Sequence, residues 1–172
     1  MYMNKLFLFG CISLLLSCSK SKDNSPPATN TNNSSNTVSG PLTATVGSNN
    51  IAFTIQIASL SQIGLMEIQG VYSSGNIAYQ LTLYGYVPHD PSTTTLNGAD
   101  PGEIEVGSTS YSTGNSPDIG TLTITSFNSI SVNEASVSGT FSFIAGQVNP
   151  TGPGSQNITN GKITNVDLYI QP

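Results

Sequence analysis

The only histidine of the chain, His89, stands in the segment Pro88-His89-Asp90-Pro91 and is the first candidate for catalysis. An imidazole oriented by a carboxylate can act as a general base toward a serine, which would make the protein a hydrolase. Neighbouring residues of an extended loop point in opposite directions, however, and the chain has no Gly-x-Ser-x-Gly segment to present a nucleophile. We therefore expect His89 to be an exposed loop residue and the protein not to be an enzyme, with a hydrolase as the remote alternative.

Carboxylates gather once in the sequence, between residues 90 and 105. Calcium takes several oxygen ligands from carboxylates, carbonyls and water, and Asp100 with Glu103 could supply some of them. No Asp-x-Asp-x-Asp-Gly segment accompanies this pair, and a glycosidase would need two carboxylates at a fixed separation across a cleft. We expect these acids to be solvated, with no metal and no cofactor, and keep Asp100 and Glu103 as weak calcium candidates.

Two tyrosines, Tyr84 and Tyr86, stand two residues apart and should lie on the same outer face of one strand. Aromatic side chains presented in this way can stack on sugar rings or on a partner surface. Exposed tyrosines are also ordinary cross-strand packing partners, which is the interpretation we favour. A carbohydrate-binding role for Tyr84 and Tyr86 is kept as the alternative.

Cys18 is the residue with the clearest chemistry. It follows an apolar run over residues 6–16 that is preceded by Lys5, and the order Leu15-Leu16-Ser17-Cys18 resembles the lipobox of bacterial lipoproteins. The run has the length of a signal-peptide core and is too short to span a bilayer. We expect lipidation at Cys18, with residues 1–17 as a signal peptide; a plain secretory signal with an incidental cysteine is the alternative.

Composition excludes several other classes. Both cysteines, Cys11 and Cys18, lie in the signal, so the rest of the chain has no disulfide, zinc or thiol-nucleophile chemistry. The chain has no arginine, and nine acidic residues stand against four lysines, which argues against nucleic acid as a partner. With charged residues at only 8%, the surface must consist mainly of Ser, Thr, Asn and Gly.

The elements around these residues fall into two parts. Residues 18–41 comprise the cysteine and a stretch rich in Ser, Asn, Thr and Pro that has too few apolar groups to offset its ordering entropy; they predict a disordered tether. Residues 42–172 alternate apolar and polar side chains with period two, and no helical period is sustained. We predict irregular loops over residues 88–102 and 146–155, a turn at residues 127–129 and a bulge near Asn165.

This pattern predicts a single all-β domain over residues 42–172. Six to nine short strands joined by turn signals are typical of an antiparallel β-sandwich or flattened barrel. The inward rows that carry the alternation are Leu42-Ala44-Val46, Ile51-Phe53-Ile55-Ile57, Met66-Ile68, Tyr79-Leu81-Leu83, Leu122-Ile124, Val137-Phe141-Phe143 and Val166-Leu168-Ile170.

The C-terminal half also resembles a family of uncharacterised Bacteroidota-type all-β lipoproteins. The resemblance is carried by residues 120–125 (GTLTIT), 138–143 (SGTFSF) and 158–166 (ITNGKITNV). The chain departs from the family at Ile163, where an aromatic residue is commoner, and in having no tryptophan. The resemblance implies fold and location only, because the family carries no activity that could be transferred.

Together these observations predict a lipid-anchored protein of the bacterial cell envelope, attached to the outer membrane through Cys18. The expected role is non-enzymatic, either binding or structural, with a glycan or another envelope protein as the partner. The stretch after Cys18 holds only one acid, Asp23, and leaves open whether the domain faces the periplasm or the cell surface.

Overall fold

The structure, a computed structural model, describes residues 38–114, 119–149 and 151–171. Cys18, the signal peptide and most of the predicted tether lie outside these residues. No helix in the described part is long and apolar enough to cross a membrane. The predicted all-β fold is confirmed.

The described residues form ten strands, one more than the upper limit of our prediction. They are β1 (Leu42–Val46), β2 (Asn49–Ser61), β3 (Leu65–Ser74), β4 (Ile77–Tyr86), β5 (Ser92–Leu96), β6 (Gly102–Val106), β7 (Thr109–Ser112), β8 (Gly120–Ser131), β9 (Glu134–Asn149) and β10 (Thr151–Gln171).

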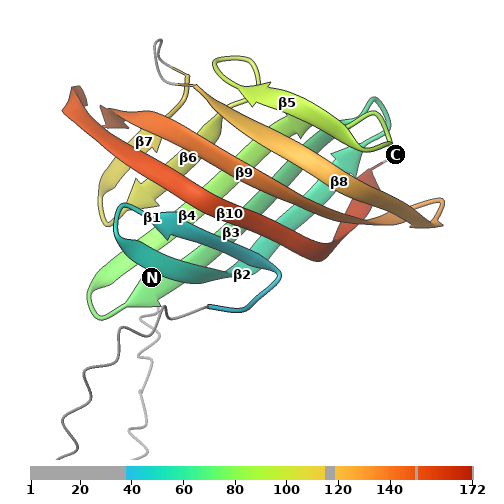
Figure 1. The fold of residues 1–172 in the computed structure, drawn as a ribbon, viewed down its shortest axis with the longest axis horizontal. Coiled ribbons are helices and arrows are strands. Elements are labelled where there is room, and N and C mark those ends of the chain that lie inside the picture. The colour runs from blue at the N-terminus through green and yellow to red at the C-terminus, as the bar shows by residue number, and fades with distance from the viewer. Residues whose placement is uncertain (1–37, 115–118, 150, 172) are drawn as a thin grey trace, which may run out of the picture. The chain divides into compact units, whose positions relative to one another are not determined.

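Eight of these strands close into a ring in the order β1-β2-β3-β4-β6-β7-β9-β10, with β10 pairing again with β1. Strand β9 pairs along one edge with β8 and then with β7, so β8 and its neighbour β5 extend from the ring. Figure 1 shows β8, β9 and β10 crossing in front of β3, β4 and β6. The fold is thus a flattened barrel with two layers.

Alternating side chains from both layers fill the space between them. Leu81 and Leu83 of β4 face Leu122 and Ile124 of β8, and each of the four is at most 2% exposed. Burying each such side chain contributes about 1.5–3 kcal/mol of transfer free energy, enough in total to hold the layers together without disulfides.

Both predicted loops contain strand, and these predictions were wrong. The segment 88–102 holds β5, because its threonines are β-branched and Leu96, which is fully buried, pairs opposite Gly120 of β8. The segment 146–155 contains the end of β9 and the start of β10. The turn predicted at residues 127–129 lies within β8 as well, and the chain reverses only after Ser131.

The bulge predicted near Asn165 is confirmed. The register of β10 against β9 shifts between Ile163 and Val166, and Asn165 has a φ of 47°. Among the other register shifts, the one between Ile55 and Ile57 of β2 was not predicted. It turns Ile57 outward, where it is 40% exposed instead of joining the core.

The turns divide between two ends of the barrel. The described chain begins at Val38, beside the β1–β2 turn and the end of β3, and we call this the entry end. The β2–β3 turn, the β8–β9 turn and Gln171, the last residue described, come together at the opposite end, which we call the far end. The far end is on the right-hand side of Figure 1.

Candidate ligand-binding site

Tyr84 and Tyr86 lie on the outer face of β4, as predicted, but their surroundings differ. Tyr84 is partly covered, and its hydroxyl donates to Glu67 Oε1 over 3.5 Å, a long distance for such a bond. Burial, followed by the charges of Glu67 and Glu103, raises the pKa of Tyr84. Tyr86 is 50% exposed and pairs with Leu65, which is 49% exposed. Tyr84 therefore lies beside an acidic side chain, whereas Tyr86 lies beside an apolar one.

The calcium candidates Asp100 and Glu103 stand on different elements. The backbone carbonyl of Asp100 accepts a hydrogen bond from Asn97 N in the β5–β6 loop (3.0 Å). Glu103, on the outer face of β6, accepts from the Ser112 hydroxyl at 3.4 Å. Within the described ranges, no three His, Cys, Asp or Glu side chains gather as metal ligands would.

His89 lies at the far end with a φ of 59° and is exposed. Its ring packs against Phe127, with 5.4 Å between the ring centroids. Ser129 and Ser131 line the same shallow hollow of about 280 Å³. The Ser131 hydroxyl accepts from Asn133 N and that of Ser129 donates to the Ser131 carbonyl, so these serines bond within their own hairpin.

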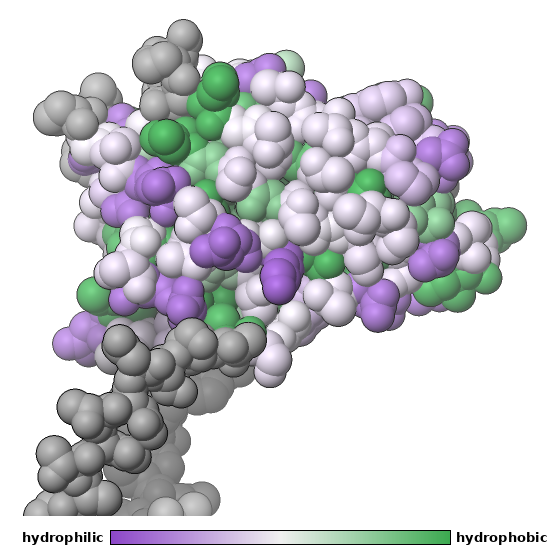
Figure 2. Space-filling model, viewed as in Figure 1, coloured by the Kyte–Doolittle hydropathy of each residue, from purple (hydrophilic) through white to green (hydrophobic). Residues whose placement is uncertain are grey.

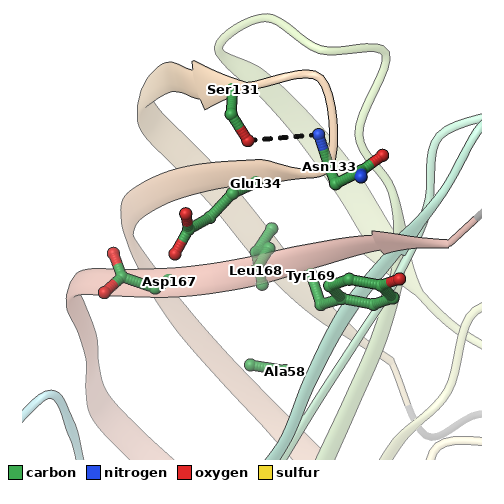
Figure 3. A pocket seen from close by; sticks show the side chains of 7 residues that line it. All are labelled: Ala58, Ser131, Asn133, Glu134, Asp167, Leu168 and Tyr169. Carbon is green, nitrogen blue, oxygen red and sulfur yellow. Dashed lines mark hydrogen bonds between the residues drawn. The ribbon is translucent and has the colours of Figure 1, made fainter.

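A second hollow at the far end has a richer chemistry. It measures about 380 Å³ and lies between β2, the β8–β9 turn and β10. Its lining residues, drawn in Figure 3, are Ala58, Ser131, Asn133, Glu134, Asp167, Leu168 and Tyr169. We call it the Tyr169 hollow.

Strand register brings its polar side chains together. Tyr169 of β10 stands opposite Glu134 of β9, and Glu134 stands opposite Ser131 of β8. Asp167 is two residues before Tyr169 and so projects from the same face of β10. Figure 3 shows the Glu134 and Asp167 carboxylates pointing to the same side, with the Tyr169 ring farther along β10.

Two backbone groups of Asn133 fix the β8–β9 turn, one within its own hairpin and one against β10. Its N–H donates to Ser131 Oγ over 3.2 Å, the bond drawn in Figure 3, and its carbonyl accepts from Ile170 N at 2.8 Å. Tyr169 is paired on both sides, with Glu134 and with Ser59 of β2. The hollow is thus built on strands paired with one another, which favours a fixed geometry.

The hollow carries negative charge. Glu134 and Asp167 are exposed carboxylates, and none of the lining residues is a Lys, Arg or His. Lys162, the only lysine or arginine in the described part of the chain, stands opposite Thr140, on the other side of the Asn165 bulge. A ligand of this hollow would meet acceptors and one exposed ring, but no nucleophile or base of the Cys or His type.

Hydrophobic surface borders the same end. Figure 2 shows a face of weakly polar residues over β8, β9 and β10, with apolar residues gathered where the β8–β9 hairpin ends. Val132 and Ile130 of that hairpin are 88% and 55% exposed, and Ile63 of the β2–β3 turn is 70% exposed.

A further hollow, of about 370 Å³, lies at the entry end beside Val38. Asn49, Asn50 and the rings of Tyr72 and Tyr79 line it, with 6.0 Å between the two ring centroids. Tyr79 is only 9% exposed and belongs to the core. This end therefore presents less open aromatic surface than the Tyr169 hollow.

Glu134, Asp167 and Tyr169 were not predicted from the sequence as site residues. Glu134 and Tyr169 are 35 positions apart in the sequence, and only the β9–β10 register makes them neighbours. One signal was present: Asp167 and Tyr169 alternate with Val166, Leu168 and Ile170, which marks both as outward on the last strand.

Comparisons with family models, curated proteins and solved structures find no match to this chain. The resemblance to Bacteroidota-type lipoproteins accordingly stays a prediction.

Proposed function

We propose that this chain is a lipid-anchored, non-enzymatic binding protein of the bacterial outer membrane. The single observation that carries the binding role is the position of the Tyr169 hollow. It lies at the far end of the barrel, whereas the described chain begins at the entry end. A domain held from its entry end presents its far end away from the point of attachment.

The anchor follows from the residues around Cys18. The thiol takes a diacylglycerol group and the freed amine a further acyl chain, and two or more chains bind a bilayer stably where one does not. Residues 19–41, as a flexible coil, would span roughly 25–30 Å. Such a tether would let the domain work clear of the lipid headgroups.

The non-enzymatic role is supported by the surroundings of the candidate groups. His89 packs on Phe127, and no hydrogen bond joins its ring to Asp90 or to a serine within the described residues. Asp100 and Glu103 bond to different neighbours. The Tyr169 hollow offers binding groups and no activated nucleophile.

Replacing Cys18 tests the anchor. Cys18→Ala removes the only sulfur that can be lipidated at the lipobox, so the protein should leave the membrane fraction and lose metabolic labelling with a fatty acid. Cell fractionation followed by immunoblotting measures both effects. Cys11→Ala is the matched control, because it removes the other thiol of the same apolar run. Membrane association that survives Cys18→Ala unchanged would contradict the anchor.

A further inference from the structure

We propose that the Tyr169 hollow binds a neutral oligosaccharide. This inference rests on the proposed binding function and names its ligand class. It moves the carbohydrate site from Tyr84 and Tyr86, on the outer face of β4, to the surface of β9 and β10 at the far end.

The first step of the argument is the exposed ring. Tyr169 is 57% exposed, yet its backbone pairs with strands on both sides. A tyrosine presents a large amphipathic surface with few rotatable bonds, so little conformational entropy is lost when a ligand covers it. A pyranose has an apolar face of C–H groups that matches such a ring, and hydroxyls around its edge.

The second step is the excess of acceptors beside the ring. Carboxylates such as those of Glu134 and Asp167 accept charge-assisted hydrogen bonds, which are stronger than neutral ones. Sugar hydroxyls are donors that fit this need, and the Asn133 side chain can both donate and accept. The volume of about 380 Å³ leaves room for a ring of this kind.

The third step is charge. Apart from the Tyr169 phenol, the titratable groups of the Tyr169 hollow are the two acids Glu134 and Asp167. Lys162 lies outside the hollow, opposite Thr140 farther along β9. An anionic sugar would be repelled by these two exposed carboxylates. A metal ion alone is a poorer fit, since no group of three ligating side chains occurs in the described part of the chain. A neutral sugar satisfies the carboxylates without adding charge.

The fourth step is the surface that continues from the hollow. The next four outward residues of β9 after Glu134 are Ser136, Ser138, Thr140 and Ser142, all with hydroxyls. Strand β8 adds Thr121 and Thr123 beside them. From Glu134 to Ser142 the strand covers about 26 Å at 3.3 Å per residue. Ser138 Oγ already bonds to Asn165, so a chain of several sugars that follows β9 would find its partners at Ser136, Thr140 and Ser142, which favours an oligosaccharide.

Tyr86 is the matched comparison. Its exposed fraction, 50%, is close to that of Tyr169. Its cross-strand neighbour is Leu65, however, and Gly64 lies against its ring. It offers an exposed ring without the two carboxylates that lie on one side of the Tyr169 ring in Figure 3. Tyr86 and Tyr169 therefore expose similar aromatic surface, and the two positions differ in the hydrogen-bond acceptors beside the ring.

Isothermal titration calorimetry of the full chain, purified from membranes in detergent, tests the proposal. The probes are cellotetraose, maltotetraose, chitotetraose and mannotetraose, with tetragalacturonate as the anionic counterpart, all in buffer containing a chelator. At least one neutral tetrasaccharide should bind. The affinity for tetragalacturonate should be about tenfold or more below the affinity for that neutral tetrasaccharide.

Variants locate the binding. Tyr169→Ala should weaken the affinity about tenfold, whereas Tyr169→Phe, which keeps the ring, should stay close to wild type. Glu134→Gln combined with Asp167→Asn should weaken neutral binding about tenfold and narrow the preference over tetragalacturonate. Tyr86→Ala should leave the affinity unchanged. Retained thermal unfolding temperatures check that each variant folds.

Two results would overturn the proposal: no neutral tetrasaccharide binds, or Tyr169→Ala binds as well as wild type. Binding that is lost in Tyr86→Ala but kept in Tyr169→Ala would place the site elsewhere while the binding function stands. The fractionation of Cys18→Ala is read independently of any sugar, so failure of the anchor and failure of this site are separate outcomes.

Discussion

The phenol of Tyr84 lies in an environment that disfavours its ionisation. Burial is the largest cause of its raised pKa, and the charges of Glu67 and Glu103 add to it. The hydrogen bond to Glu67, at 3.5 Å, contributes least. All these causes act in the same direction, because each disfavours the phenolate.

This shift predicts a loss of stability in alkali. The folded pKa lies above the ordinary value of 10.0, so the stabilising contribution is complete below that value and is lost as the pH rises through the folded pKa. Tyr84→Phe has no such proton to lose. Between about pH 9 and about pH 11, wild type should therefore lose more free energy of unfolding than Tyr84→Phe does.

Urea denaturation at both pH values measures this difference, with Tyr86→Phe as the control on the same face of β4. The control should follow wild type. Equal losses in wild type and Tyr84→Phe would show that the phenol is not coupled to folding.

At the residue scale, the sequence predicted which face of a strand a side chain occupies better than it predicted which side chains lie around it. Alternation correctly placed Leu81 and Leu83 inward and Tyr84 and Tyr86 outward. It could not tell that Glu67 would stand opposite Tyr84, or Glu134 opposite Tyr169, because those pairs depend on the register between strands. The candidate site was missed for this reason.

Asn165 shows how one residue sets the course of a whole strand. It takes a left-handed backbone conformation, and its N–H donates to Ser138 Oγ at 3.0 Å while its side chain oxygen accepts from that hydroxyl at 3.1 Å. Asparagine tolerates this conformation better than most residues. The bulge lets Ile163 and Val166 both point into the core, since it absorbs the extra residue between them.

Substitutions at Asn165 should separate the contribution of its backbone conformation to stability from the contribution of its side chain. Asn165→Ala should lower the free energy of unfolding by about 2 kcal/mol, from the strained φ and the lost hydrogen bond. Asn165→Gly should cost about half as much, because glycine adopts the same φ freely. Chemical denaturation measures both, and Thr164→Ala is the exposed neighbouring control. A larger loss in Asn165→Gly than in Asn165→Ala would contradict this account.

At the scale of elements, the strand β5 explains why turn signals can mislead. Two prolines and an Asp-Pro-Gly segment favour a loop over residues 88–102, yet Ser92–Leu96 form a strand within it. What decides is an available edge: β8 extends beyond the ring and can pair with Ser92–Leu96. Local preference carries no information about such an edge, so tertiary pairing overrides it.

The whole molecule closes through its last strand. β10 pairs with β9 along most of its length, with β1 around its middle and with β2 at its end. The parallel contact with β2 joins the C-terminal residues to the N-terminal part of the fold. Period-two alternation predicts strands but not their order in a sheet, so this closure had no signal in the sequence.

Closure by β10 makes a prediction about cooperativity. Leu168 is fully buried in the shared core, whereas its neighbour Tyr169 is 57% exposed. Leu168→Ala should lower the free energy of unfolding by about 2–5 kcal/mol and shift a single transition that all strands share. Tyr169→Ala should change the stability by less than about 1 kcal/mol, since exposed positions away from the core are tolerant.

Thermal unfolding followed by circular dichroism, together with amide hydrogen exchange on β4, measures the two effects. The exchange of β4 amides, in the opposite layer from Leu168, should accelerate in Leu168→Ala if the ring unfolds as one unit. Faster exchange confined to β9 and β10 would mean that the far end opens by itself. A hollow built on a cooperative ring stays preorganised until the whole barrel unfolds, so Tyr169→Ala should affect ligand binding without affecting the fold.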